Sequence, residues 1–218
     1  MRVVFDIGHG SDTYPKSPDK GIGDFHEHTF NSAVAVEAKR MAEAQGIEVL
    51  FSQQPNAPEV KLNARCNWIA AEHKKKPVDC LVSFHANNGM ASASGWGVFH
   101  WHNSEKGERL AQLWAKHAAE LPIPKWGTGI WKCVPNTWTN FDIVRKPAMP
   151  CILIEHFFFT NKAELALCNT PGFISKAATV TVKALCEYGG IQYKDDKDET
   201  IKRLNALLDS IQTILYKR

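Results

Sequence analysis

Five short apolar segments, separated by stretches with a helical pattern, constrain the fold of this 218-residue chain more than any other feature. Most of them carry apolar side chains on both faces of the predicted strand, which indicates a mostly parallel sheet covered by helices on both sides. The sequence therefore predicts a three-layer α/β/α domain over residues 1–188. The five predicted strands are Arg2–Ile7, Ile47–Phe51, Asp79–His85, Gly97–Trp101 and Cys151–Glu155.

A different pattern follows this domain. Residues 189–199 are rich in charged and turn-forming residues and are predicted to be a linker. In residues 200–218 the apolar side chains follow a 3-4-3-4 spacing, which predicts one C-terminal amphipathic helix. Such a helix is marginal alone in water, so its apolar seam is expected to dock on its own domain or to form a homodimer or partner contact.

The composition excludes several classes of protein. The balance of 26 Lys and Arg against 23 Asp and Glu is too weak to predict nucleic-acid binding. No window approaches the roughly 18 consecutive apolar residues of a membrane span. The first residues, MRVVFDIGHG, lack the apolar stretch and cleavage site of a secretory signal, so the chain is expected to stay in the cytoplasm until it is released. None of the six cysteines forms a C-x-x-C pair, which argues against a cysteine zinc site.

Three residues that can bind or serve a metal stand at the ends of predicted strands: His9, His85 and Glu155. The carboxyl ends of parallel strands converge on one crevice, so these side chains are expected to meet. A fourth group comes from the segment GDFHEHTFN, in which the spacing alone does not choose among His26, Glu27 and His28.

Two histidines and one carboxylate with an open fourth position form a typical catalytic zinc site. Zinc lowers the pKa of water in such a position to roughly 7. A nearby carboxylate that is not a ligand can accept the proton and pass it to a leaving nitrogen. The pattern thus favours metal-assisted amide hydrolysis, and the chain has no G-x-S-x-G motif that would favour a serine nucleophile.

Four blocks in this order resemble those of the zinc-dependent N-acetylmuramoyl-L-alanine amidases of type 3, over residues 1–188. The blocks are Asp6 to Gly10; Gly23 with Glu27 to Asn31; Arg65, Asn67 and Ser83 to Asn87; and Arg145 with Pro150 to Glu155 and Phe158 to Asn161. The resemblance implies hydrolysis of the amide between the lactyl group of N-acetylmuramic acid and L-alanine in peptidoglycan.

Carried over to this chain, the resemblance implies that His9, Glu27 and His85 bind Zn²⁺ and that Glu155 is the general base. Asn87 and Arg145 are further candidates for substrate binding. The chain departs from the family pattern after Glu155, where His156 and Phe157 replace a small residue and a glycine. His156 is expected on the opposite face of the strand from Glu155, in a structural role.

Several alternatives stay open on the sequence. A zinc carboxypeptidase or deacetylase would have a similar metal geometry, and a murein-binding protein could keep the fold without catalysis. A phage endolysin is favoured over a host autolysin because no export signal is apparent. Four tryptophans in glycine- and threonine-rich stretches either stack on sugars or pack on the core; they are Trp96, Trp126, Trp131 and Trp138.

Overall fold

The computed structural model describes residues 1–195 and contains one six-stranded sheet in the order β4-β1-β5-β8-β6-β7. The predicted helix over 200–218, the homodimer contact assigned to it and the end of the linker, residues 196–199, lie outside the described residues. The strands of the sheet are β1 (Arg2–Ile7), β4 (Glu48–Phe51), β5 (Cys80–Asn87), β6 (Trp96–Trp101), β7 (Lys125–Cys133) and β8 (Cys151–Phe158).

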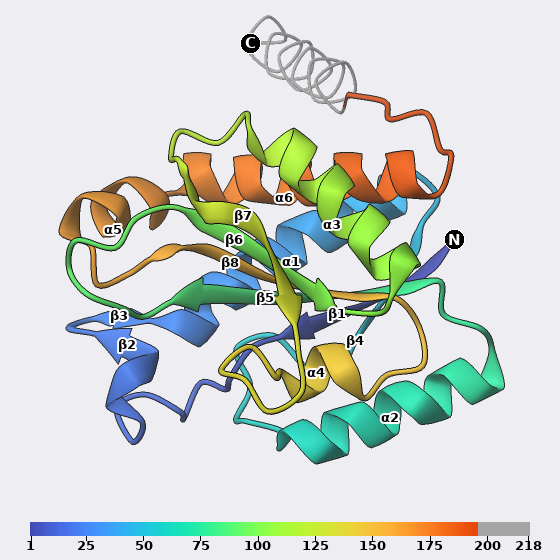
Figure 1. Ribbon diagram of the computed structural model, residues 1–218, viewed down its shortest axis with the longest axis horizontal. Coiled ribbons are helices and arrows are strands. Elements are labelled where there is room, and N and C mark those ends of the chain that lie inside the picture. Colours follow the sequence, from blue (N-terminus) through green and yellow to red (C-terminus); the bar gives the residue numbers. More distant parts are fainter. Residues whose placement is uncertain (196–218) are drawn as a thin grey trace, which may run out of the picture.

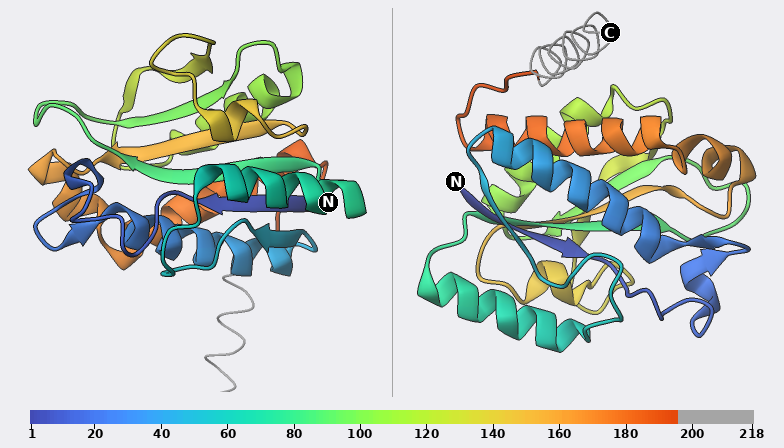
Figure 2. Two further views of the ribbon diagram at one scale, coloured as in Figure 1. Left: turned by 90° about the horizontal axis from the view of Figure 1, so that it is seen from below. Right: turned by 180° about the vertical axis from the view of Figure 1, so that it is seen from behind.

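Helices cover both faces of this sheet, as the sequence predicts (Figure 1). One face carries the long helices α1 (Glu27–Ala44), α3 (Glu105–Ala118) and α6 (Pro171–Tyr188), and Figure 2 shows α1 and α6 side by side. The other face carries α2 (Leu62–Lys75) and the short α4 (Asp142–Arg145). Between β8 and α6 lies α5 (Lys162–Cys168), and before α1 lie the short helix η1 (Pro18–Lys20) and the hairpin of β2 (Gly21–Ile22) and β3 (Phe25–His26).

All five predicted strands are present in the main sheet, whereas its sixth strand, β7, and the hairpin strands β2 and β3 were not predicted. The sheet is mostly parallel, but β6 runs antiparallel to β8, and β7 is parallel to β6. The amino ends of β6 and β7 therefore lie at the same edge of the sheet as the carboxyl ends of β5 and β8. Helix α1 begins at Glu27, which places this residue in the first turn of the helix.

A buried ion pair and two hydroxyl groups join four segments on the α2 face: β1, the residue after β4, α2 and β5. Arg65 of α2 donates from Nη1 to Oδ1 of Asp6 in β1 at 2.6 Å, and both side chains are almost fully buried. The hydroxyls of Ser52 and Ser83 also donate to the Asp6 carboxylate, at 2.5 and 2.7 Å. Burial opposes the ionisation of Asp6, but Arg65 and the two hydroxyls outweigh it and hold the pKa of Asp6 below its usual value. The network fixes β1 and β5 relative to each other just before each reaches the candidate site.

His156 has the structural role that the sequence predicts. It is fully buried on the α1 face, where its ring stacks on Phe84 at a centroid distance of 6.0 Å and meets Phe30 edge-on. Its Nδ1 lies 2.9 Å from the backbone carbonyl of His85, to which it can donate a hydrogen bond. Burial lowers the pKa of His156 to about 4, so the ring is neutral in the native protein at neutral pH.

This burial predicts a pH-dependent stability. Between about pH 6.5 and pH 4 the unfolded chain protonates His156 and the folded chain does not, so the free energy of unfolding falls as the pH falls. His156→Phe removes that dependence, and urea titrations at pH 7 and pH 4.5 should show a loss of stability on acidification that is smaller by about 2 kcal/mol than in the parent. An equal loss in both proteins would contradict the assignment.

Candidate metal centre

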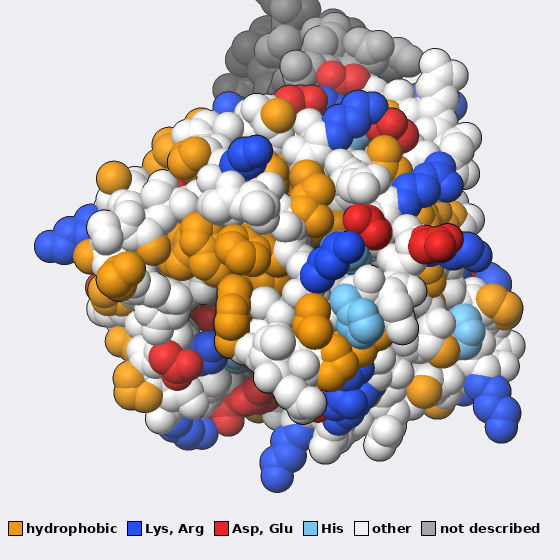
Figure 3. All heavy atoms as spheres, in the orientation of Figure 1, with side chains coloured by type: hydrophobic (Ala, Val, Ile, Leu, Met, Phe, Trp, Pro, Cys, Tyr) orange, Lys and Arg blue, Asp and Glu red, His pale blue; other side chains and the backbone are white. Residues whose placement is uncertain are grey.

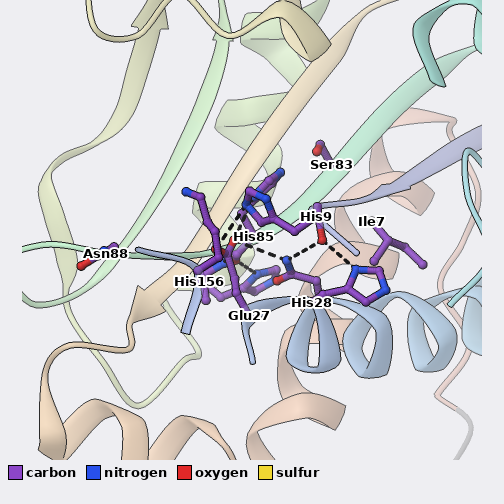
Figure 4. A network of polar contacts seen from close by, with 12 residues as sticks. Ile7, His9, Glu27, His28, Ser83, His85, Asn88 and His156 are labelled. Atoms are coloured by element: carbon purple, nitrogen blue, oxygen red, sulfur yellow. Dashed lines mark hydrogen bonds and ion pairs between the residues drawn. The ribbon is translucent and has the colours of Figure 1, made fainter. Parts of the chain in front are cut away.

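Three side chains from three separate segments meet at the end of the sheet where the parallel strands reach their carboxyl ends. They are His9, Glu27 and His85 (Figure 4). One ligand atom from each lies within 4.8 Å of the others. Oε2 of Glu27 is 3.3 Å from Nε2 of His9, and Oε1 is 3.0 Å from Nδ1 of His85. The two rings stand almost perpendicular, at 88°, with their centroids 5.0 Å apart. The carboxylate thus lies between two imidazoles.

His9 is held by an unusual backbone conformation directly after β1. Its φ of 62° lies in the left-handed region, which is uncommon for a residue other than glycine. The amide of Gln53 donates hydrogen bonds to the carbonyls of Ile7 and His9, which anchors this turn from outside. Gly8 is required by contact with its neighbour, because a Cβ at this position would lie 2.2 Å from Cε1 of His85. The glycine therefore lets the two imidazoles approach each other.

Glu27 is fixed by its place as the first residue of α1. Its side chain is 2 % exposed, and a carboxylate at a helix amino terminus is stabilised by the macrodipole. Asn31, one helical turn later, donates to Oε1 at 3.4 Å, and the backbone amide of Ala86 donates to the same oxygen at 3.3 Å. Burial opposes the ionisation of Glu27, but His9 and His85 outweigh it and hold its pKa below the usual value.

The helix start also decides among the three residues that the sequence left open. The ring of His28 is buried and its Nδ1 lies 2.8 Å from the carbonyl of Gly8, so it supports the turn from the core side. The ring of His26 packs edge-on against Tyr14. Glu27 is the one of the three that joins the cluster.

Glu155 lies next to this cluster. In the β5–β8 ladder it is in register with His85, so both side chains lie on the same face of the sheet. Its Oε2 is buried and has no hydrogen-bond partner among residues 1–195. Burial raises the pKa of Glu155 well above its usual value, the charge of Glu27 raises it further, and Lys20 opposes both.

Sequence reasoning did not single out Lys20. It lies at the end of η1, is ion-paired with Asp19 at 3.2 Å, and is close enough for Glu27 and Glu155 to contribute to the rise of its own pKa against the effect of burial. The only sequence signal was a lysine in a segment of turn-forming residues, which is typical of a solvated loop.

The two residues predicted to bind substrate, Asn87 and Arg145, lie at different ends of the sheet. Asn87 ends β5 at the edge that carries the cluster, and its carbonyl accepts a hydrogen bond from the amide of Phe159 at 3.0 Å. Arg145 ends α4, is ion-paired with Asp142, and lines a hollow of about 480 Å³ together with Cys151, the first residue of β8. That is the opposite end of β8 from Glu155, so the structure does not bring Arg145 to the cluster.

The cluster fits a catalytic zinc ion by its donor set. Two imidazoles and one carboxylate are the ligands of open catalytic sites, in contrast to the all-oxygen shells that Mg²⁺ and Ca²⁺ prefer. Burial lowers the pKa of His85 against the opposing effect of Glu27, and a neutral ring keeps a lone pair for a cation. The geometry of the described side chains is thus compatible with a three-ligand metal centre.

Comparison with known proteins decides the family. The sequence profile of the family described as N-acetylmuramoyl-L-alanine amidase matches residues 3–187. The chain belongs to this amidase family. It is therefore an amide hydrolase of peptidoglycan by family, in agreement with the order of the four sequence blocks. A search of curated proteins finds no match.

Solved amidase structures share the fold. The catalytic domain of CwlV from Bacillus (Paenibacillus) polymyxa var. colistinus is 22% identical, with a TM-score of 0.69 over 88% of this chain and 99% of that one. Ami1 from Mycobacterium smegmatis is 19% identical, with a TM-score of 0.72 over 87% and 97% of the two chains. AmiC2 from Nostoc punctiforme is 21% identical, with a TM-score of 0.70 over 86% and 96%. Among the residues described for this amidase, no helix has the length and apolarity needed to span a bilayer.

The contact at Gly8 predicts that Gly8→Ala weakens metal binding although it changes no ligand. The added Cβ displaces the imidazole of His85, and zinc affinity is expected to fall by about 10- to 100-fold, as for other residues that orient metal ligands. Competition with a fluorescent zinc chelator measures this. The matched control is Gly172→Ala in the first turn of α6, where a Cβ meets no atom within 4 Å. Equal affinities in the two variants would contradict the role given to Gly8.

Proposed function

We propose that this amidase cleaves the bond between the lactyl group of N-acetylmuramic acid and L-alanine with a zinc ion held by His9, Glu27 and His85, and with Glu155 as general base. The observation that carries the proposal is the position of Glu155. It is in register with the ligand His85 on the neighbouring strand, on the same face, and yet does not belong to the ligand cluster. A carboxylate in that position is free to move protons.

The division of labour follows from the surroundings of the two carboxylates. Glu27 is flanked by two imidazoles that favour its charged form, so it is suited to hold a cation. When bound, zinc supplies Lewis-acid polarisation of the substrate carbonyl and lowers the pKa of water. Glu155 has an unpaired oxygen and a raised pKa, so it can accept a proton from water and donate it to the departing amino group of alanine.

Glu155→Gln tests this division. The amide keeps the shape of the carboxylate but cannot accept the proton, so the turnover number is expected to fall by about 10²- to 10⁴-fold while bound zinc stays near one per chain. Glu43→Gln, on the exposed end of α1, should leave both quantities unchanged. The release of stem peptides from sacculi measures turnover, and elemental analysis measures zinc. If Glu155→Gln lost the metal, Glu155 would be a ligand and not the base.

The products distinguish this proposal from its rivals. Amidase action on purified sacculi frees stem peptides with an L-alanine amino terminus, which mass spectrometry identifies. A carboxypeptidase would shorten the carboxyl end of the stem, a deacetylase would release acetate, and a murein-binding protein would release nothing. The expected release should stop when a chelator removes the metal and return when zinc is added back.

We further propose that the chain acts as an endolysin, which reaches the wall only after the membrane is opened. One structural relative is described as the catalytic domain of an endolysin that targets Clostridia difficile, at 17% identity and a TM-score of 0.63. In bacteria that express the chain, the walls should stay intact until the membrane is permeabilised. Wall hydrolysis in cells with an intact membrane would instead favour an exported autolysin.

A further inference from the structure

Three indole rings form one continuous surface on the face of the sheet that carries Glu155. The ring centroids of Trp126 and Trp131 are 4.7 Å apart, and Trp138 lies 5.9 and 5.8 Å from them. We call Trp126, Trp131 and Trp138 the tryptophan platform. Phe99 and Phe158 pack against it, with centroid distances between 5.1 and 6.3 Å.

The platform begins one strand away from Glu155. In the antiparallel ladder Glu155 is in register with Gly97 of β6, so the two positions share a face. A Cβ at Gly97 would lie 3.2 Å from Cε3 of Trp126 and 3.4 Å from Nε1 of Trp131, which shows that the indoles lie over this glycine. His85, Glu155 and the platform thus follow one another across three neighbouring strands.

Part of the platform is open to solvent. Trp138 is 62% exposed, and Trp126 and Trp131 are half-buried. Figure 3 shows hydrophobic side chains gathered on the surface over β6 and β7. The exposed part of the platform therefore offers aromatic faces, which single exposed aliphatic residues do not.

We propose that the tryptophan platform binds the saccharide rings of the glycan strand next to the bond that is cleaved. The inference rests on the proposed function, which places the reacting carbonyl beside Glu155. Three bonds, about 4 Å, separate that carbonyl from the sugar ring in muramic acid. One strand spacing, about 4.8 Å, separates Glu155 from Gly97 beneath the indoles. A carbonyl at Glu155 therefore brings the sugar to the platform.

The chemistry of the surface selects a sugar over the other occupants. The C–H-lined faces of a pyranose stack on an indole, and the indole of Trp138 is 62% exposed. The stem peptide starts on the other side of the scissile amide and leads away from the sugar. A second copy of the chain on the platform would cover the edge at which Glu155 must meet its substrate.

Tryptophan fluorescence tests the proposal without requiring hydrolysis. The probe is a peptide-free oligosaccharide of alternating N-acetylglucosamine and N-acetylmuramic acid, titrated into the zinc-loaded full chain. Trp138→Ala is expected to raise its dissociation constant by about tenfold, and Trp138→Phe, which keeps an aromatic face, by about threefold or less. The matched control is Trp68→Ala on α2, a tryptophan outside the platform that is 36% exposed, which should bind like the parent.

The outcomes separate this inference from the proposed function. Equal glycan affinity in the parent and in Trp138→Ala would overturn the inference, even if the parent hydrolyses sacculi. Loss of affinity for the free stem peptide in place of the glycan, or a concentration-dependent dimer that Trp138→Ala abolishes, would also overturn it. If the parent binds the oligosaccharide through Trp138 but releases no L-alanine amino termini, the proposed function fails and the sugar site stands.

Discussion

The site depends on one buried carboxylate placed between two imidazoles. A carboxylate as buried as that of Glu27 is costly unless it is paired, and its two oxygens face His9 and His85 at 3.3 and 3.0 Å. The need to pair this carboxylate with both imidazoles explains the local structure around it. Helix α1 begins at Glu27, the strand before His9 ends in a turn of left-handed conformation, and Gly8 leaves room for the ring of His85. The Asp6 carboxylate joins β1 to α2 through Arg65 and to β5 through Ser83.

The sequence predicted the residues of this site better than it predicted their surroundings. His9, His85 and Glu155 could be found because parallel strands end together, and the structure brings these ends to one edge. The choice of Glu27 over His26 and His28 needed the family resemblance, since it depends on the helix start. Lys20, Gln53 and Asn31 contact the site only in the folded chain, and no spacing in the sequence reveals these contacts.

The elements that escaped prediction have recognisable physical causes. Strand β7, KWGTGIWKC, contains two glycines with positive φ and no clear alternation of polar and apolar residues. What favours it is the packing of Trp126 and Trp131 on Phe99, which is a long-range effect.

After Glu155 the bulky His156 and Phe157 replace a small residue and a glycine of the family pattern, and both fill the core under α1.

Because β6 and β7 run opposite to the other strands, the end of the sheet that holds the candidate site combines the carboxyl ends of β5 and β8 with the amino ends of β6 and β7. The parallel strands β5 and β8 contribute His85 and Glu155, whose positions depend on the path of the backbone. The reversed strands bring the segments that enter β6 and β7 to the same end of the sheet. Those entering segments connect elements at the surface and tolerate insertions more readily than the strand ends that carry His85 and Glu155. The segments that enter β6 and β7 can therefore change in evolution while the ends of β5 and β8, with His85 and Glu155, stay the same.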